Sequence, residues 1–113
     1  MAKRKRLLDE FPDVMDRAYK QYQRQQLIFY FYIGYGNYTG RSAQSLSEFA
    51  DVIATVDVTS LDFHLYGGDF ERWITEKGFP QLAAKFRAIR RRKVKGEPLR
   101  QALSQIMSVF FTD

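Results

Sequence analysis

The sequence predicts a mainly α-helical fold, a compact bundle of five or six helices with or without one short β-strand pair. Three observations support this prediction. Apolar residues recur at spacings of three and four in several segments, glycine or proline separates these segments, and the hydrophobic fraction is 45%. A chain of 113 residues is long enough to bury one core. We therefore expect a single helical domain over residues 9–113, preceded by a basic flexible arm at residues 1–8.

The first part of the predicted domain combines a helix with an aromatic strand. Pro12 suits a first helical position, because the N–H that proline lacks has no helical partner there, and we predict a helix over residues 12–26. The aromatic-rich residues 27–33 predict a buried strand. Its expected partner is either residues 56–58 or the same strand of another subunit. Residues 34–40, rich in glycine, predict a loop.

A clear helix start follows this loop. Ser45 and Glu48 have the spacing of a capping box, in which the serine accepts from the backbone N–H of the glutamate. Apolar residues at helical spacing come directly after it. The pattern predicts a helix over residues 46–54.

Two short helices are predicted around a glycine pair. Ser60 is expected to cap a helix over residues 61–66, which Gly67 and Gly68 end. Asp69 is expected to cap the next helix, over residues 70–77.

The last third of the chain predicts two longer helices. Pro80 opens the first of them, which extends to about residue 93. Gly96 ends that region, and Pro98 opens the last helix, whose apolar stripe is the most regular in the chain.

Composition excludes several kinds of site. The chain has no cysteine, which removes disulfides, Cys-ligated zinc, iron–sulfur clusters and thiol catalysis. It has one histidine, so no site can use two imidazoles. We therefore predict no metal, no cofactor and no enzymatic activity. No stretch approaches the ~18 apolar residues of a membrane span, and no signal-peptide pattern is present, so we expect a cytoplasmic protein.

One trio of residues resembles a catalytic triad in type: Ser60, His64 and Asp69. Because Ser60 and Asp69 are both predicted to cap helices, their oxygens are expected to be occupied by backbone N–H groups. No oxyanion-hole element accompanies them. We expect His64 to be partly buried and hydrogen-bonded to Asp69, without a catalytic role.

Charge is distributed unevenly along the chain. Residues 41–76 contain two bases and seven acids, a net charge of −5, whereas residues 77–100 contain nine bases and one acid, a net charge of +8. Most of the excess lies in a basic block, comprising Lys85, Arg87, Arg90, Arg91, Arg92, Lys93 and Lys95. Because like charges repel, we expect this block to be neutralised by phosphates or by the acidic region of the same or a neighbouring chain.

Two functions are compatible with this charge pattern. The first is a non-enzymatic interaction or adapter module that docks on another protein through the basic helix face, or that self-associates into a homo-oligomer. The alternative is a DNA- or RNA-binding protein that uses the basic block together with the N-terminal arm. The bases of that arm are Lys3, Arg4, Lys5 and Arg6.

Two further features lie in and beside the predicted loop. A glycine-rich turn before a helix can bind an anion, and the residues that would do so are Gly40, Arg41 and Ser42. The neighbouring tyrosines could stack on nucleobases, but tyrosines more often fill a core, and we expect core positions here. These tyrosines are Tyr30, Tyr32, Tyr35 and Tyr38.

A longer motif gives a family resemblance. The chain contains Ser-Leu-Asp-Phe-His from Ser60, Gly-Asp-Phe-Glu-Arg-Trp-Ile from Gly68, and an earlier Tyr-Thr-Gly at 38–40. This arrangement resembles the signature of a small family of uncharacterised, mostly archaeal domains over about residues 29–110. The resemblance implies a shared folding unit and a prokaryotic cytosolic setting, and no activity. We expect the signature residues Ser60, His64, Asp69 and Trp73 to be structural, because they surround a two-glycine corner.

Overall fold

The computed structural model describes residues 27–112. These residues form an antiparallel β-hairpin followed by five helices, which confirms the predicted fold class. The elements are β1 (Phe29–Tyr32), β2 (Tyr38–Ala43), α3 (Leu46–Thr55), α4 (Val58–Tyr66), α5 (Asp69–Glu76), α6 (Pro80–Arg91) and α7 (Glu97–Thr112). The predicted basic arm at residues 1–8 and the predicted helix over residues 12–26 lie outside the described residues.

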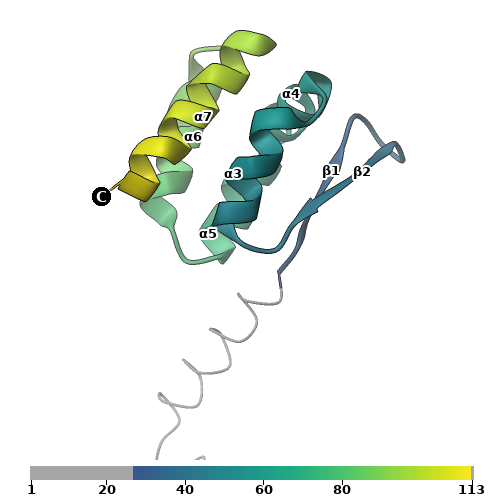
Figure 1. The fold of residues 1–113 in the computed structure, drawn as a ribbon. Coiled ribbons are helices and arrows are strands. Elements are labelled where there is room, and N and C mark those ends of the chain that lie inside the picture. The colour runs from purple at the N-terminus through teal and green to yellow at the C-terminus, as the bar shows by residue number, and fades with distance from the viewer. Residues whose placement is uncertain (1–26, 113) are drawn as a thin grey trace, which may run out of the picture.

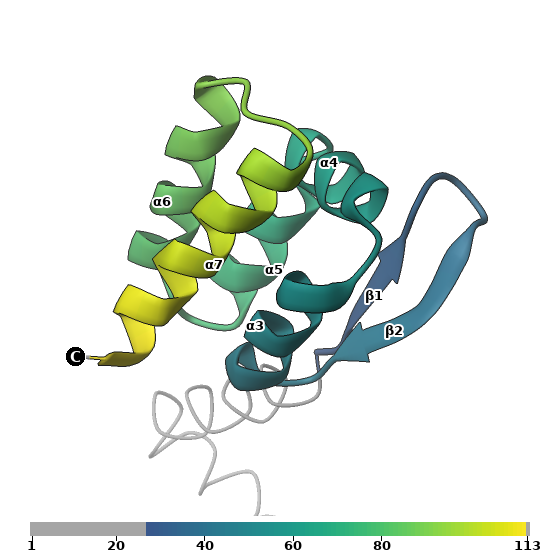
Figure 2. The same ribbon diagram turned by 45° about the horizontal axis from the view of Figure 1, so that its top comes forward.

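The hairpin stands at one side of the helices, and α6 and α7 lie at the opposite side (Figure 1). Helices α3 and α4 pack against β2 and β1 respectively, and α5 packs against α6. Figure 2 shows α6 and α7 running antiparallel beside each other. The carboxyl end of α6 therefore lies at the opposite end of the bundle from the end of α7.

The partner of the aromatic strand differs from the prediction. β1 pairs with β2, with Phe29 opposite Ala43 and Phe31 opposite Arg41. Pairing with residues 56–58 was wrong, because the Asp57 side chain accepts from the backbone N–H of Thr59 and starts α4 there. The predicted loop is also shorter than residues 34–40, since a tight turn brings the chain back to β1 by Tyr38.

The core is built on phenylalanine rings from four elements. Phe31 of β1, Phe49 of α3, Phe70 of α5 and Phe86 of α6 are all fully buried. Their ring centroids are 5.7 Å apart for Phe31 and Phe49, 5.2 Å for Phe49 and Phe70, and 5.9 Å for Phe70 and Phe86. Aromatic pairs at such distances add about 0.5–1.5 kcal/mol beyond burial. This chain of rings attaches the hairpin to α3, α5 and α6.

The helix boundaries confirm some predicted caps and correct others. Ser45 accepts from the N–H of Glu48, as predicted, and α3 begins at the next residue. Ser60 is not a cap, because Asp57 starts α4 three residues earlier and leaves Ser60 buried inside the helix. Asp69 is not a cap either, since Gly68 occupies the N-cap position and Asp69 is the first residue of α5.

Candidate functional site

Helix α6 from Lys85 onward, together with the loop after it, carries the largest group of unneutralised charges in the described chain. Five cations there are exposed and form no ion pair with any residue between 27 and 112: Lys85, Arg91, Arg92, Lys93 and Lys95. Lys85 and Arg92 lie seven residues apart, which is two helical turns and places them on the same face. We call these five residues the cationic surface.

Two members of the predicted basic block do not belong to this surface. Nε of Arg90 lies 2.6 Å from Glu71, and Nε of Arg87 lies 3.2 Å from the same carboxylate. Burial alone would raise the pKa of Glu71, but the hydrogen bonds from Arg90 and Arg87 outweigh it and hold the pKa below 4.5. The acidic region of the same chain thus neutralises part of the block, because α5 and α6 pack side by side.

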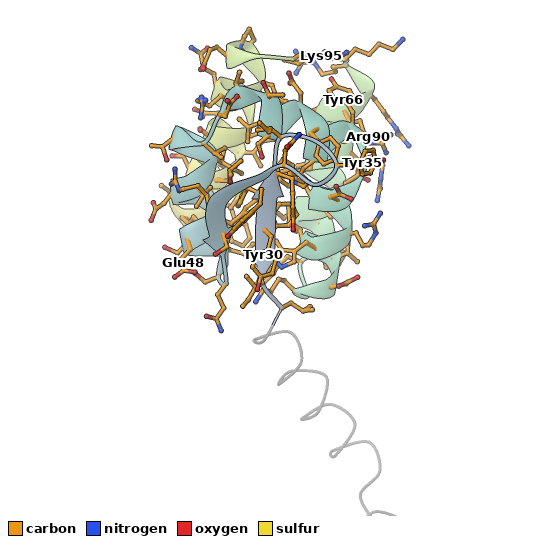
Figure 3. The ribbon with its side chains drawn as sticks, turned by 90° about the vertical axis from the view of Figure 1, so that its right-hand side faces the viewer. Tyr30, Tyr35, Glu48, Tyr66, Arg90 and Lys95 are labelled. Atoms are coloured by element: carbon orange, nitrogen blue, oxygen red, sulfur yellow. The ribbon has the colours of Figure 1, made fainter. Side chains whose placement is uncertain are left out.

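The loop between α6 and α7 is held by contacts to α4. Nζ of Lys95 lies 5.3 Å from the ring centroid of Tyr66, a cation–π contact, and Figure 3 shows these two residues at the same end of the molecule. The Tyr66 hydroxyl donates to the carbonyl of Val94 at 2.5 Å, and Asp62 accepts from the N–H of Gly96. The loop that carries Lys93 and Lys95 of the cationic surface is therefore held in place by α4.

Two signature residues, His64 and Asp69, form a partly buried hydrogen-bond chain with the backbone of Tyr32. Nδ1 of His64 lies 2.8 Å from a carboxylate oxygen of Asp69, as the sequence predicted, and Nε2 accepts from the backbone N–H of Tyr32 at 2.8 Å. Because Nε2 is an acceptor, the proton of the neutral ring resides on Nδ1. Burial lowers the pKa of His64 below 6.5 despite the neighbouring Asp69 carboxylate. His64 joins β1, α4 and α5 as a neutral residue.

Two other signature residues carry buried polar atoms. Oγ of Ser60 and Nε1 of Trp73 have no hydrogen-bond partner within the described part of the chain. Both residues pack inside the core, Ser60 fully and Trp73 with 6% of its surface exposed. Ser60 does not contact His64 through a hydrogen bond, so these residues do not assemble a nucleophile and its base.

A cleft of about 610 Å³ opens beside the His64–Asp69 pair. One of its walls is β1 with the two residues before it, and the other is formed by α5 together with Phe63 of α4. Tyr35, at the tip of the hairpin, reaches over the cleft and stacks edge-on against Phe63 with centroids 5.4 Å apart. The cleft is thus mainly aromatic, with charged side chains along α5.

The predicted anion-binding turn has a different local structure. Gly40, Arg41 and Ser42 lie in β2, and the Arg41 guanidinium donates to the hydroxyl of Thr55 at 2.8 Å. They do not lead directly into a helix N-terminus, because α3 begins only at Leu46. The geometry on which that prediction depended is therefore absent from these residues.

Most of the tyrosines predicted to fill the core are surface residues. Tyr35 is 96% exposed, Tyr30 49% and Tyr38 48%, and only Tyr32 is half-buried. The alternation of a strand explains this, since Phe29 and Phe31 take the inward positions of β1. The four predicted binding residues of the arm, Lys3, Arg4, Lys5 and Arg6, lie outside the described residues.

Comparison of the chain with protein-family models, with curated proteins and with solved structures gives no match. None of the helices between residues 27 and 112 has the length and apolar character needed to cross a membrane. In the same region, no three His, Asp or Glu side chains lie together in a way that could hold a metal ion. The resemblance to the archaeal domain signature remains a prediction.

Sequence reasoning missed the contacts that join distant segments. The Tyr32–His64 bond spans 32 positions, and Arg100 donates to the backbone carbonyls of Ile53 and Val56, 47 and 44 positions away. No local pattern signals a backbone partner that lies so far away in the sequence. The cleft was missed for the same reason, because its walls meet only in the folded chain.

Proposed function

We propose that this protein is a non-enzymatic docking module that binds an acidic surface of a partner protein through the cationic surface at the end of α6. The observation that carries the proposal is the group of five exposed cations without an ion pair in the described chain. Like charges so close together repel one another, and an anionic partner relieves that repulsion. Because the backbone that carries the cations is an ordered helix and loop, little backbone conformational freedom is lost on binding.

An apolar groove at the start of α6 favours a protein as the partner. The groove shares Lys85 with the cationic surface, whereas the other four cations lie at the far end of the helix or in the loop after it. It measures about 510 Å³, and its lining includes Phe79, Phe110 and Lys85. Phe79 and Phe111 are large apolar residues with 41% and 51% of their surfaces exposed. Exposed apolar surface next to charge is typical of protein–protein interfaces, whereas a surface that only follows phosphates needs no apolar part.

Self-association through opposite charges has less support. It requires free carboxylates in the acidic region, but most of them have partners within the chain. Glu71 holds two arginines, Asp69 contacts His64 and Arg72, and Asp62 and Asp57 accept from backbone N–H groups. An external acidic partner is the better counterpart for the cationic surface.

Binding of DNA or RNA phosphates is the second candidate function, and the same five cations favour it. The two functions differ in salt dependence and in their need for the apolar groove. Nucleic-acid affinity is expected to fall by about 10³-fold or more between ~50 and ~200 mM salt if six or more phosphates are contacted. Binding of an acidic peptide that also uses the groove is expected to fall less.

The test uses fluorescence anisotropy with three probes: an acidic peptide with interspersed leucines, a DNA duplex and a single-stranded RNA. The variant Arg91→Gln with Arg92→Gln removes two positive charges from the cationic surface. Its control, Ser47→Glu with Ala54→Glu, makes the same change in net charge at exposed positions of α3, a helix that contributes no residue to the cationic surface or to the groove.

We expect the arginine variant to bind the acidic peptide about tenfold more weakly, because two charge pairs are lost, and the control to bind almost as the parent does. Equal weakening in both variants would mean that net charge alone attracts the probe, which contradicts a localised docking surface. Tight, steeply salt-dependent binding of DNA or RNA without peptide binding would favour the second function.

A further inference from the structure

The cleft follows the outer edge of β1. Consecutive residues that face opposite sides of the strand line it together, namely Ile28, Phe29 and Tyr30. Residues from both faces meet in one cleft only where the cleft runs along the strand edge. In the described chain β1 pairs with β2 alone, so no strand covers its other edge.

The backbone groups of that edge point into the cleft. The N–H of Tyr32 reaches His64, which lines the cleft, so it points away from β2. Residues two apart in a strand direct their backbone groups to the same side, and the N–H and C=O of Tyr30 therefore also face the cleft. The register change in the hairpin leaves β1 regular, because the extra residues, Thr39 and Gly40, belong to β2. Tyr30 thus offers one donor and one acceptor to a passing chain.

His64 limits where a chain can pair. Its Nε2 already occupies the N–H of Tyr32, so pairing ends there and is confined to the part of the edge before Tyr32. The opposite wall is α5, on which Asp69, Arg72 and Glu76 follow at spacings of three and four and so share one face. A cleft between a strand edge and a helix wall can accommodate an extended peptide segment.

The charges of the cleft indicate what such a segment carries. Arg72 is paired with Asp69, whereas Glu76 is exposed at the rim and forms no ion pair with the described residues. The two carboxylates and one guanidinium leave a net charge of −1 in a chain whose overall charge is +5. A basic side chain near Glu76, between apolar side chains that contact the aromatic wall, complements this cleft.

We propose that the cleft binds an extended peptide segment of a partner protein, which adds a strand to the edge of β1 at Tyr30 and places a lysine or arginine beside Glu76. This site is separate from the cationic surface and does not depend on the function proposed for it. Pairing between the β1 edges of two copies of the chain is a poorer fit, because residues 27–33 contain no charged residue to meet Glu76.

The first experiment selects peptides on the full-length protein from a library of nine-residue sequences, in which apolar residues alternate with random ones. We expect enrichment of peptides that carry one lysine or arginine. Binding is then measured by titration calorimetry for the parent, for Glu76→Lys and for the control Asp51→Lys. Asp51 is an exposed acid of α3. It does not line the cleft, and it forms no salt bridge in the described chain.

Glu76→Lys is expected to weaken binding of the selected peptide by at least about tenfold, because it replaces an attraction by a repulsion. Asp51→Lys is expected to leave the affinity for the peptide within about twofold of the parent's. N-methylation of the peptide, one position at a time, gives the second measurement. Pairing with the edge at Tyr30 requires loss of binding at the position whose N–H donates to the Tyr30 carbonyl, and little loss at the two neighbouring positions, whose N–H groups point away from β1.

Several results would overturn the proposal. One is that no peptide of the library binds the immobilised protein more tightly than it binds the bare support. Others are that Glu76→Lys and Asp51→Lys weaken binding equally, or that N-methylation is harmless at all positions. A concentration-dependent doubling of mass that Glu76→Lys leaves intact and that selected peptides do not reverse would assign the edge to a second copy instead. The Arg91→Gln, Arg92→Gln variant separates the two sites, since it leaves the peptide affinity of the cleft unchanged.

Discussion

Nε2 of His64 accepts a hydrogen bond from the backbone N–H of Tyr32 at 2.8 Å, which ties the hairpin to the helices. The other ring nitrogen, Nδ1, is hydrogen-bonded to the Asp69 carboxylate, so each nitrogen of the imidazole has one partner. Protonation would place a second N–H against the N–H of Tyr32, and two donors cannot bond to each other. The attachment of β1 to α4 therefore depends on a neutral histidine.

This arrangement predicts that stability falls in mild acid. The pKa of His64 is lowered by burial in the folded state, and its ordinary value in the unfolded chain is 6.5. The unfolded chain therefore binds more protons between these two values, so the free energy of unfolding is highest above pH 6.5 and decreases as pH falls from there toward the folded pKa. Urea unfolding at pH values from 8 to 5 measures the decrease.

The matched variant for this measurement is His64→Gln, whose side-chain oxygen can accept from the N–H of Tyr32 but does not titrate. We expect it to be less stable than the parent at pH 8 and to show a flatter pH dependence below pH 6.5. Parallel curves for the two proteins would show that carboxylates, and not His64, cause the acid sensitivity.

The Glu71 carboxylate predicts a second stability effect. Its hydrogen bonds to Arg90 and Arg87 make the ionised form favourable, so Glu71→Gln is expected to destabilise the fold by about 1 kcal/mol, a modest figure because both guanidinium groups remain partly in water. Chemical denaturation at pH 7 measures the loss. Glu76→Gln removes an exposed acid with no ion pair in the described chain and is expected to change stability by less than about 0.5 kcal/mol.

The same variant has a consequence for the proposed function. Glu71→Gln releases two arginines beside the cationic surface, so we expect it to bind the acidic peptide more tightly while the fold becomes less stable. Weaker binding would mean that Glu71 is needed to position the surface and that the released charges do not reach the partner.

Gly68 gives a prediction about the two-glycine corner. Its φ is +76°, and a Cβ at this position would meet no atom within 4 Å, so the cost of a side chain is conformational only. Gly68→Ala is expected to destabilise by about 1–2 kcal/mol. Gly34→Ala is the control, because Gly34 has no positive φ and its Cβ would make only an ordinary 3.7 Å contact with Asn37. Equal losses from the two substitutions in thermal unfolding would contradict this explanation.

How far the sequence predicts this structure depends on the range of each signal. The start of α3 and the start of α6 were predicted correctly, because Ser45 with Glu48, and Pro80, act within one helical turn. β2 was missed because its inward positions before Ala43 are Thr39 and Arg41, so apolar residues do not alternate along it. The burial and pairing of His64 were expected, but its bond to Tyr32 was not.

The cationic surface shows the same limit. The excess of bases over residues 77–100 was read correctly from the composition. Which arginines remain unpaired depends on the packing of α5 against α6, since this packing alone brings Glu71 to Arg87 and Arg90. Five exposed cations could therefore be identified only in the fold.

Substitution of Ser60 is predicted to stabilise the fold, whereas substitution of a buried residue usually destabilises it. The Oγ of Ser60 is fully buried and has no partner in the described chain, so the hydroxyl has lost its water without gaining a hydrogen bond. Ser60→Ala removes that group and also favours the helix, and we expect it to stabilise the fold by about 1–2 kcal/mol. Ser108→Ala, at an exposed position of α7, changes helix propensity alone and is expected to contribute about 0.5 kcal/mol. Urea unfolding of both variants separates the two terms, because only the excess of Ser60→Ala over Ser108→Ala reports on the buried hydroxyl. A loss of stability in Ser60→Ala would mean that the hydroxyl has a partner, and the structural role assigned to this signature residue would then need that partner to be identified.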